Sequence, residues 1–237
     1  MTSDLLEALR LRLAQEADAD KAPRMQAYMK SSMPYHGVTV PRVREICREV
    51  FEHVEFRNAA AWSRAVRAMW RRAAFREERF GAIVLSGHKA AAAFQTLDAL
   101  ALYEEMIVTG AWWDYVDDIA EHRVGPIVLA DPASMKPVMR TWSVSPHLWK
   151  RRTSIICQNA FKDETDEALL LACIEPSVDS KEFFLRKAIG WSLRMYARIQ
   201  PRRVLAYVRA NRRRLSPLSK REALKALLRA GTVAAVP

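Results

Sequence analysis

Residues 180–201 read SKEFFLRKAIGWSLRMYARIQP, and the residues at their two ends are start and stop signals of a single helix. Ser180, with an acid two residues later, is typical of a helix start, and Pro201 is typical of a stop. Similar signals recur along the chain, as in TVPRVREICREVF from Thr39 and SPLSKREALKALLRAG from Ser216. Glycine is scarce, at 7 of 237 residues, and no segment alternates apolar and polar residues with a period of two. We therefore predict an all-α protein with roughly a dozen helices.

Several predicted helices resemble one another and begin at a regular spacing. Each opens on a large apolar residue, continues with polar or charged residues and then becomes more apolar; the openings are Phe75, Trp113, Trp149, Phe184 and Leu218. They lie 38, 36, 35 and 34 residues apart, which is the length of one helix pair with its turns. We therefore predict a single domain over residues 1–237, a curved α-solenoid of helix pairs with these helices on the concave face. The alternative is a globular helical bundle with coincidental spacing.

Positive charge is concentrated in the second half of the chain. The whole chain carries 38 Lys+Arg and 27 Asp+Glu, a net charge of +11. Residues 1–120 have a net charge of −1, whereas residues 121–237 have a net charge of +12. Such a bias favours nucleic acid as the partner, then an anionic membrane, with a solubilising surface as the simplest alternative. Because Arg and Lys dominate the first turns of the similar helices, we expect a basic concave groove.

The sequence shows no pattern of a metal site, a secretion signal or a membrane span. The three cysteines, Cys47, Cys157 and Cys173, are widely spaced, and we interpret them as core residues. The five histidines lack metal-ligand spacing. The first residues do not resemble a signal peptide, and no apolar run reaches ~20 residues. We expect a cytoplasmic protein without a metal.

The stretch WWDYVDD, residues 112–118, interrupts the basic row with three carboxylates beside two indoles. On a helix, Trp113 and Asp117 share one face. The simplest interpretation is first-turn Asp residues beside core tryptophans. However, a carboxylate flanked by indoles, with Trp191 as a further indole among basic residues, suits a cation embedded in a polyanion. An N-alkylated purine in DNA is such a cation, and so is the sugar formed when an N-glycosidic bond breaks.

The chain resembles the AlkD-like DNA alkylation-repair glycosylases, which are built from HEAT-like repeats. The matching segments run in the family's order from about residue 20 to 230 and are AYMKSSMPYHGVTVPRVR, WWDYVDDIA, WKRRTSI, KEFFLRKAIGWSLRMYA and LSKREA. The resemblance implies a base-excision repair enzyme that hydrolyses the N-glycosidic bond of cationic alkylpurines such as 3-methyladenine and 7-methylguanine. It implies that the lesion stays in double-stranded DNA without flipping, that an abasic site is left, and that no cofactor takes part.

The resemblance also implies roles for particular residues. The catalytic carboxylate falls on Asp117, which would stabilise the sugar cation and orient the attacking water. Trp113 and Trp191 would pack on the sugar and backbone at the lesion. Arg152 would contact phosphate and shape the site, although Arg151 is open as the phosphate contact. Further DNA or lesion contacts are expected from Tyr28, Lys187 and Arg194.

Two other functions stay open at this point. One is a catalytically silent module that binds bent or branched DNA, and the other is an RNA- or protein-binding helical scaffold. Base release from alkylated DNA would separate the glycosylase from both. We expect a monomer that works in the cytoplasm of a bacterial-type cell and associates with the nucleoid during repair. Trp112 stays open between the core and the groove.

Overall fold

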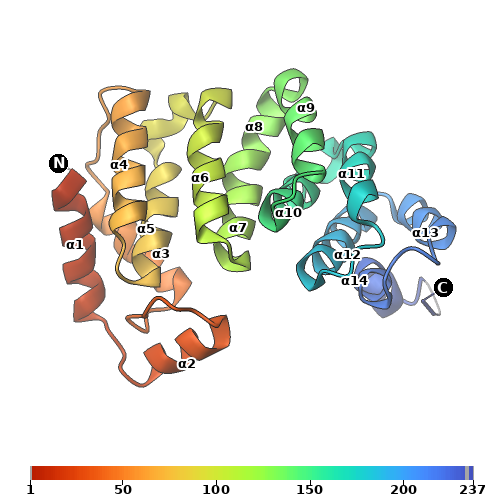
Figure 1. Cartoon of the computed structure of the whole chain (residues 1–237), viewed down its shortest axis with the longest axis horizontal. Coiled ribbons are helices and arrows are strands. Elements are labelled where there is room, and N and C mark those ends of the chain that lie inside the picture. The colour runs from red at the N-terminus through yellow and green to blue at the C-terminus, as the bar shows by residue number, and fades with distance from the viewer. Residues whose placement is uncertain (1, 233–234, 237) are drawn as a thin grey trace. The chain divides into compact units, whose positions relative to one another are not determined.

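The computed structural model describes residues 2–232 and 235–236, and these residues form helices and turns with no strand among them (Figure 1). The prediction of an all-α protein is confirmed. The chain divides into two compact units, Met1–Leu102 and Tyr103–Pro237, and the boundary falls inside helix α6, Leu100–Gly110. A single solenoid domain with a basic groove stays a prediction.

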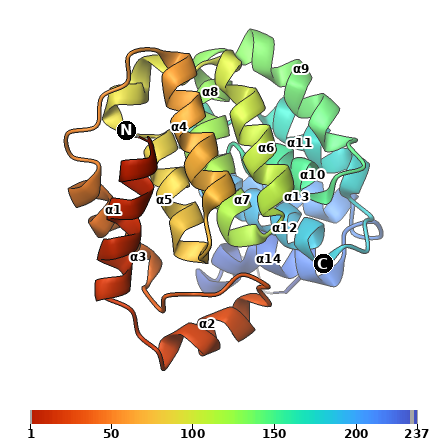
Figure 2. The same cartoon turned by 60° about the vertical axis from the view of Figure 1, so that its left-hand side comes forward.

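The first unit is built around helix α5. Its α-helices before α6 are α1 (Thr2–Gln15), α2 (Lys21–Met29), α3 (Val40–Val50), α4 (Ala59–Arg72) and α5 (Arg76–Ser86), and two 3₁₀ turns follow at Lys89–Phe94 and Leu97–Ala99. Helices α1, α3 and α4 all pack on α5. Because α5 is surrounded, even the polar residues of its first turn are buried. Helix α2 instead lies at the edge of the unit in both views (Figure 1 and Figure 2).

The second unit contains the remaining helices. They are α7 (Trp113–Ile119), α8 (Gly125–Ala130), α9 (Pro132–Ser143), α10 (Leu148–Ile156), α11 (Glu167–Ile174), α12 (Phe183–Ala197), α13 (Pro201–Ala210) and α14 (Pro217–Arg229). Short 3₁₀ turns occupy Lys162–Glu164 and Glu175–Ser177, and a π-helical turn, Ala120–Val124, joins α7 to α8.

Four of the five helices predicted to resemble one another form a series in the second unit. Helix α7 packs on α10, α10 on α12, and α12 on α14. Helix α9 packs on α10, and α13 packs on α12. Helices α5, α7, α10, α12 and α14 each begin within one residue of the predicted opening. The predicted helix starts are therefore confirmed, and they place the polar first turns of α7, α10 and α12 on adjacent helices.

A local signal explains the start of α14 but not that of α12. Ser216 caps α14 by accepting a hydrogen bond from the backbone N–H of Ser219. By contrast, α12 begins at Phe183 with Glu182 at its N-cap position, and Ser180 lies outside it. The Ser180 carbonyl accepts a hydrogen bond from Nε of Arg186 instead. Ser180 thus anchors the segment before α12 and does not start the helix.

Helices α12 and α14 approach each other at Gly190. A Cβ atom on Gly190 would lie 2.5 Å from Cβ of Glu222 and 2.8 Å from the carbonyl oxygen of Ser219. Close helix packing therefore requires glycine at this position. The apolar core around this contact includes Leu185, Ile189, Leu193, Ala223 and Leu224, all fully buried.

The cysteines lie where the sequence predicts. Cys47, Cys157 and Cys173 are all free and fully buried. Burial raises the pKa of Cys47 and of Cys173 to about 12, and it raises the pKa of Cys157 well above its ordinary value. Their interpretation as core residues is confirmed.

Candidate functional site

The candidate site centres on an ion pair between the neighbouring helices α7 and α10. Asp117 on α7 and Arg152 on α10 are 35 residues apart in sequence. Nε of Arg152 donates to Oδ1 of Asp117, and Nη2 donates to Oδ2, both at 2.7 Å. This two-bond geometry fixes the plane of the carboxylate, because both groups are planar and rigid.

Arg152 also reaches helix α12. Its Nη1 donates to the carbonyl oxygen of Phe184 at 2.6 Å, and its guanidinium carbon lies 5.9 Å from the centre of the Phe184 ring. The side chain of Arg152 is 4% exposed, against 15% for Asp117. Arg152 therefore links α7, α10 and α12 and holds the carboxylate of Asp117 in place.

The neighbouring Arg151 has different surroundings. Its side chain is half-buried, and Nε has no hydrogen-bond partner among the described residues. Since Arg152 is occupied by protein acceptors through Nε, Nη1 and Nη2, Arg151 is the better placed of the two for an anion. The sequence alone favours Arg152 for the phosphate role.

Two opposed effects act on the ionisation of Asp117. Burial raises its pKa above the ordinary value, while the hydrogen bonds and positive charge of Arg152 act in the opposite direction. Asp118 raises the pKa of Asp117 further by repulsion. Glu121, one turn after Asp117, also has a raised pKa because it is buried, although Nδ2 of Asn159 donates to it at 3.0 Å. The site thus gathers carboxylates in surroundings that oppose their ionisation.

The backbone is irregular beside these acids. Helix α7 changes after Ile119 into the π-helical turn Ala120–Val124, which contains Glu121. Single π turns inside α-helices occur frequently at functional sites. Asn159, the partner of Glu121, accepts a hydrogen bond from the Ser192 hydroxyl at 2.7 Å. A polar chain therefore connects the π turn with α12.

Aromatic rings pack beside the ion pair. The ring of Trp112 lies 6.1 Å from Trp149 and 5.4 Å from Phe184, and the rings of Trp149 and Phe184 are 4.9 Å apart. Trp112 is half-buried and belongs to this cluster. Phe183 lies against Phe184 at 5.3 Å and is 56% exposed.

The sequence interpretation did not single out Phe183 or Phe184 as site residues. The feature that could have pointed to them is the pair of adjacent phenylalanines near the start of the segment SKEFFLRKAIGWSLRMYARIQP. Trp113 is half-buried on α7, and Trp191 is half-buried against the core around α12 and α14. The structure records no ring contact between either of these tryptophans and the aromatic cluster.

The expected cations Lys187 and Arg194 share one partner. Nζ of Lys187 lies 2.9 Å from Oε1 of Glu222 on α14, and Nη1 of Arg194 is paired with Oε2 of the same carboxylate. Lys187 and Arg194 flank Trp191 by four and three residues, so Glu222 holds both cations on the side of that indole. The sequence interpretation missed Glu222, which is the acid of LSKREA.

Tyr28 belongs to the first unit. It lies on α2, with 76% of its surface exposed. The other expected site residues all lie in the second unit: Trp113, Asp117, Arg151, Arg152, Lys187, Trp191 and Arg194. Of these, Asp117 and Arg152 are in direct contact.

The described residues hold neither a cluster of metal ligands nor a membrane-spanning helix. Within residues 2–232 and 235–236, no group of three or more His, Cys, Asp or Glu side chains is arranged to hold a metal ion. Over the same residues, no helix is both long and apolar enough to span a membrane.

Comparison with known proteins places the chain in a family. The family model described as "DNA alkylation repair enzyme" matches residues 9–227. A solved structure entitled "Predicted DNA alkylation repair enzyme from Enterococcus faecalis" is similar, with a TM-score of 0.79 and 26% sequence identity. The match covers 89% of this chain and 96% of that one. No curated protein matched the chain. Because the family model covers most of the sequence, the chain belongs to the DNA alkylation repair enzyme family.

Proposed function

We propose that this protein is a DNA glycosylase that hydrolyses the N-glycosidic bond of cationic N3- and N7-alkylated purines in duplex DNA. The observation that carries the proposal is the carboxylate of Asp117, held by two hydrogen bonds from the buried Arg152. Membership of a DNA alkylation repair family supports the choice of substrate. The products are an abasic site and a free alkylpurine such as 3-methyladenine or 7-methylguanine.

The chemistry needs a stabilised cation and not a proton donor. In a cationic alkylpurine, the bond between C1′ and the purine nitrogen breaks with its electron pair going to the base, which leaves neutral. Positive charge then develops on the sugar, and a water oxygen bonds to C1′ while its surplus proton goes to solvent. Each oxygen of Asp117 keeps a lone pair beyond the one that Arg152 occupies, so the carboxylate can face the sugar and the water. A preorganised charge of this kind typically accelerates a reaction by ~10²–10³.

The surroundings of the ion pair fit a sugar–phosphate partner. We assign Trp113 and Trp191 to the sugar and backbone at the lesion, and Arg151, Lys187 and Arg194 to phosphates. Arg152 acts mainly by holding Asp117 and shaping the site. The base is proposed to leave from the duplex without being flipped, and neither a metal nor an organic cofactor takes part.

The wider organisation is part of the same proposal. We propose that the two units form one HEAT-like helical-repeat domain whose concave face is a basic groove for DNA. The net charge of +12 in residues 121–237 supports this choice of partner. The protein is proposed to act as a monomer on DNA in the cytoplasm.

The deciding experiment is base release from methylated duplex DNA. Purified protein is incubated with the DNA, and released bases are separated by chromatography. The proposal expects 3-methyladenine or 7-methylguanine in the soluble fraction and heat-labile abasic sites in the DNA, at a rate that Asp117→Asn reduces. Tight DNA binding without any base release would instead identify a catalytically silent DNA-binding module. Preferential binding of RNA without base release would identify an RNA-binding scaffold.

A further inference from the structure

Helix α2 carries Tyr28 but is held by little packing. Tyr28 is 76% exposed, and Met29 is the residue of α2 that is buried. The helix lies at the edge of the first unit in both views (Figure 1 and Figure 2). With so little buried apolar surface, the helix needs another anchor if its side chains are to keep one position.

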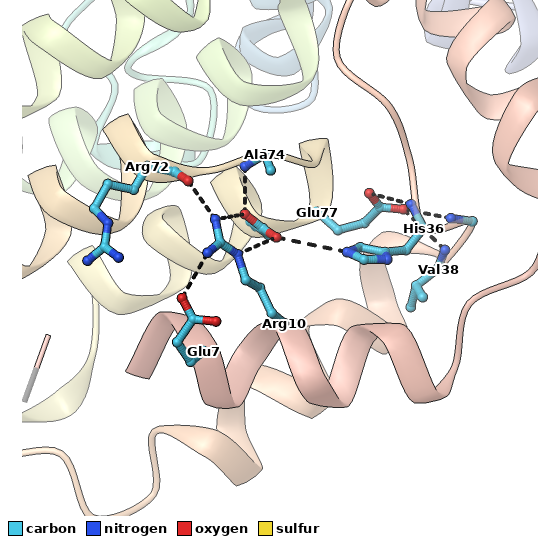
Figure 3. A network of polar contacts seen from close by, with 9 residues as sticks. Glu7, Arg10, His36, Val38, Arg72, Ala74 and Glu77 are labelled. Carbon is cyan, nitrogen blue, oxygen red and sulfur yellow. Dashed lines mark hydrogen bonds and ion pairs between the residues drawn. The ribbon is translucent and has the colours of Figure 1, made fainter. Parts of the chain in front are cut away.

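The anchor is a buried carboxylate on α5. Glu77 is 1% exposed, and it accepts hydrogen bonds from three consecutive backbone N–H groups in the segment that leaves α2 (Figure 3). The donors are His36 at 3.1 Å, Gly37 at 2.9 Å and Val38 at 3.2 Å. Hydrogen bonds to a charged acceptor are stronger than those between neutral groups, so this contact fixes the segment firmly.

The same junction also holds the chain that enters α2. The backbone N–H of Asp18 donates to the carbonyl of His36 at 2.8 Å, and the N–H of Arg76 donates to the carbonyl of Pro34 at 3.0 Å. Gly37 has φ +90, and a Cβ atom there would lie 2.3 Å from the carbonyl oxygen of Asp18. Both ends of the α2 segment therefore meet at the N-terminus of α5, under the carboxylate of Glu77.

Glu78, the carboxylate next to Glu77, makes different contacts. Glu78 pairs with Nε of Arg10 on α1 at 3.0 Å and accepts a hydrogen bond from the N–H of Ala74 at 2.7 Å (Figure 3). Arg10 in turn donates to the carbonyl of Arg72 at 2.7 Å. Glu78 thus ties α1 to the turn before α5. Its Oε1 also lies 4.0 Å from Nε2 of the His36 side chain (Figure 3), whereas the backbone N–H groups of His36, Gly37 and Val38 donate to Glu77. It is the control for Glu77, because it is a neighbouring glutamate of similar burial that contacts the His36 side chain and not the backbone of the junction.

We propose that Glu77 is a positioning residue, whose carboxylate holds the junction beneath α2 and so fixes where Tyr28 stands for contact with lesion DNA. The contact between Tyr28 and DNA rests on the proposed function. The anchoring of α2 does not, and it is tested separately.

The anchoring is tested by amide hydrogen exchange on the free protein. In the unsubstituted protein, the amides of Gly37 and Val38 should exchange slowly although they lie outside any helix. Glu77→Gln places an amide N–H against at least one of the three donors. Exchange in residues 36–38 should then become about tenfold faster or more, after correction for each variant's global stability, and trypsin should cleave α2 sooner.

Control variants decide whether the effect belongs to Glu77. Glu78→Gln should leave the amides of Gly37 and Val38 protected. If Glu77→Gln does not fold, Gly37→Ala disturbs the same junction from the other side and should give the same loosening. Fast exchange of residues 36–38 in the unsubstituted protein, or equal loosening by Glu78→Gln, would overturn the anchoring.

The link to Tyr28 is tested by a double-mutant cycle on base excision. Tyr28→Ala and Glu77→Gln should each raise KM while leaving kcat at saturation close to its original value. The double variant should match Tyr28→Ala, because Glu77 acts through that residue. Effects that multiply would overturn the positioning role. Absence of excision by the unsubstituted protein would refute the proposed function, while hydrogen exchange would still decide the anchor.

Discussion

Replacing Asp117 with Asn separates the charge of the carboxylate from its shape. The side chain keeps its size, but one oxygen that accepts from Arg152 at 2.7 Å becomes an amide nitrogen facing a guanidinium N–H. The negative charge opposite the developing sugar cation is lost as well. We expect excision of 7-methylguanine to fall by ~10²–10³, equivalent to about 2.7–4 kcal/mol of transition-state stabilisation.

The same change should lower stability, because Arg152 is buried. One of its donors loses its partner, and an unsatisfied buried polar group costs about 1–3 kcal/mol. The free energy of unfolding is therefore measured by urea titration beside the excision rate, and the rate is taken under single-turnover conditions at saturating protein. DNA binding should be unchanged or slightly tighter, because a negative charge near phosphates is removed.

Asp114→Asn and Asp118→Asn are the matched controls. Both acids lie on the same helix as Asp117, and neither pairs with Arg152 in the contacts of that side chain. Each should reduce the rate much less than Asp117→Asn does. If Asp118→Asn abolished excision while Asp117→Asn was nearly normal, the catalytic assignment would be wrong. If all three variants excised normally, the carboxylate of Asp117 would be structural only.

Three further predictions concern the second unit. The logarithm of DNA affinity should fall linearly with the logarithm of salt concentration, by roughly 0.9 per phosphate contacted, and a flat dependence in a binding titration would contradict electrostatic binding. Because burial raises the pKa of Asp117 and the ionised form is the active one, the excision rate should fall as the pH is lowered through that raised pKa. A pH–rate profile checks this, and the fall should disappear in Asp117→Asn. Gly190→Ala should destabilise the protein by about 1–3 kcal/mol in urea titration, because its Cβ would lie 2.8 Å from the backbone oxygen of Ser219.

Helix starts were predictable because their signals are local. Ser216 before Pro217 gave the start of α14, and large apolar residues gave the others to within one residue. Ser180 misled the prediction, because α12 begins at Phe183 and the backbone oxygen of Ser180 instead accepts a hydrogen bond from Arg186, six residues later. The repeat spacing suggested that Asp117 and Arg152 lie on successive similar helices.

The partners that organise the site were not predictable in the same way. Glu222 lies 35 residues from Lys187 and 28 from Arg194, and Glu77 lies 41 residues from His36. A sequence shows such acids as ordinary members of a charged helix, because what distinguishes them is burial and the neighbours supplied by folding. The phenylalanine pair at the start of α12 was visible, but its contact with Arg152 required the structure.

The burial of all three thiols affects how the protein itself reacts with alkylating agents. Methylating agents attack soft nucleophiles, and a cysteine reacts chiefly as its thiolate. Cys47, Cys157 and Cys173 are fully buried, and their raised pKa values keep them protonated. Cys47, Cys157 and Cys173 are therefore shielded from alkylating agents for as long as the protein stays folded.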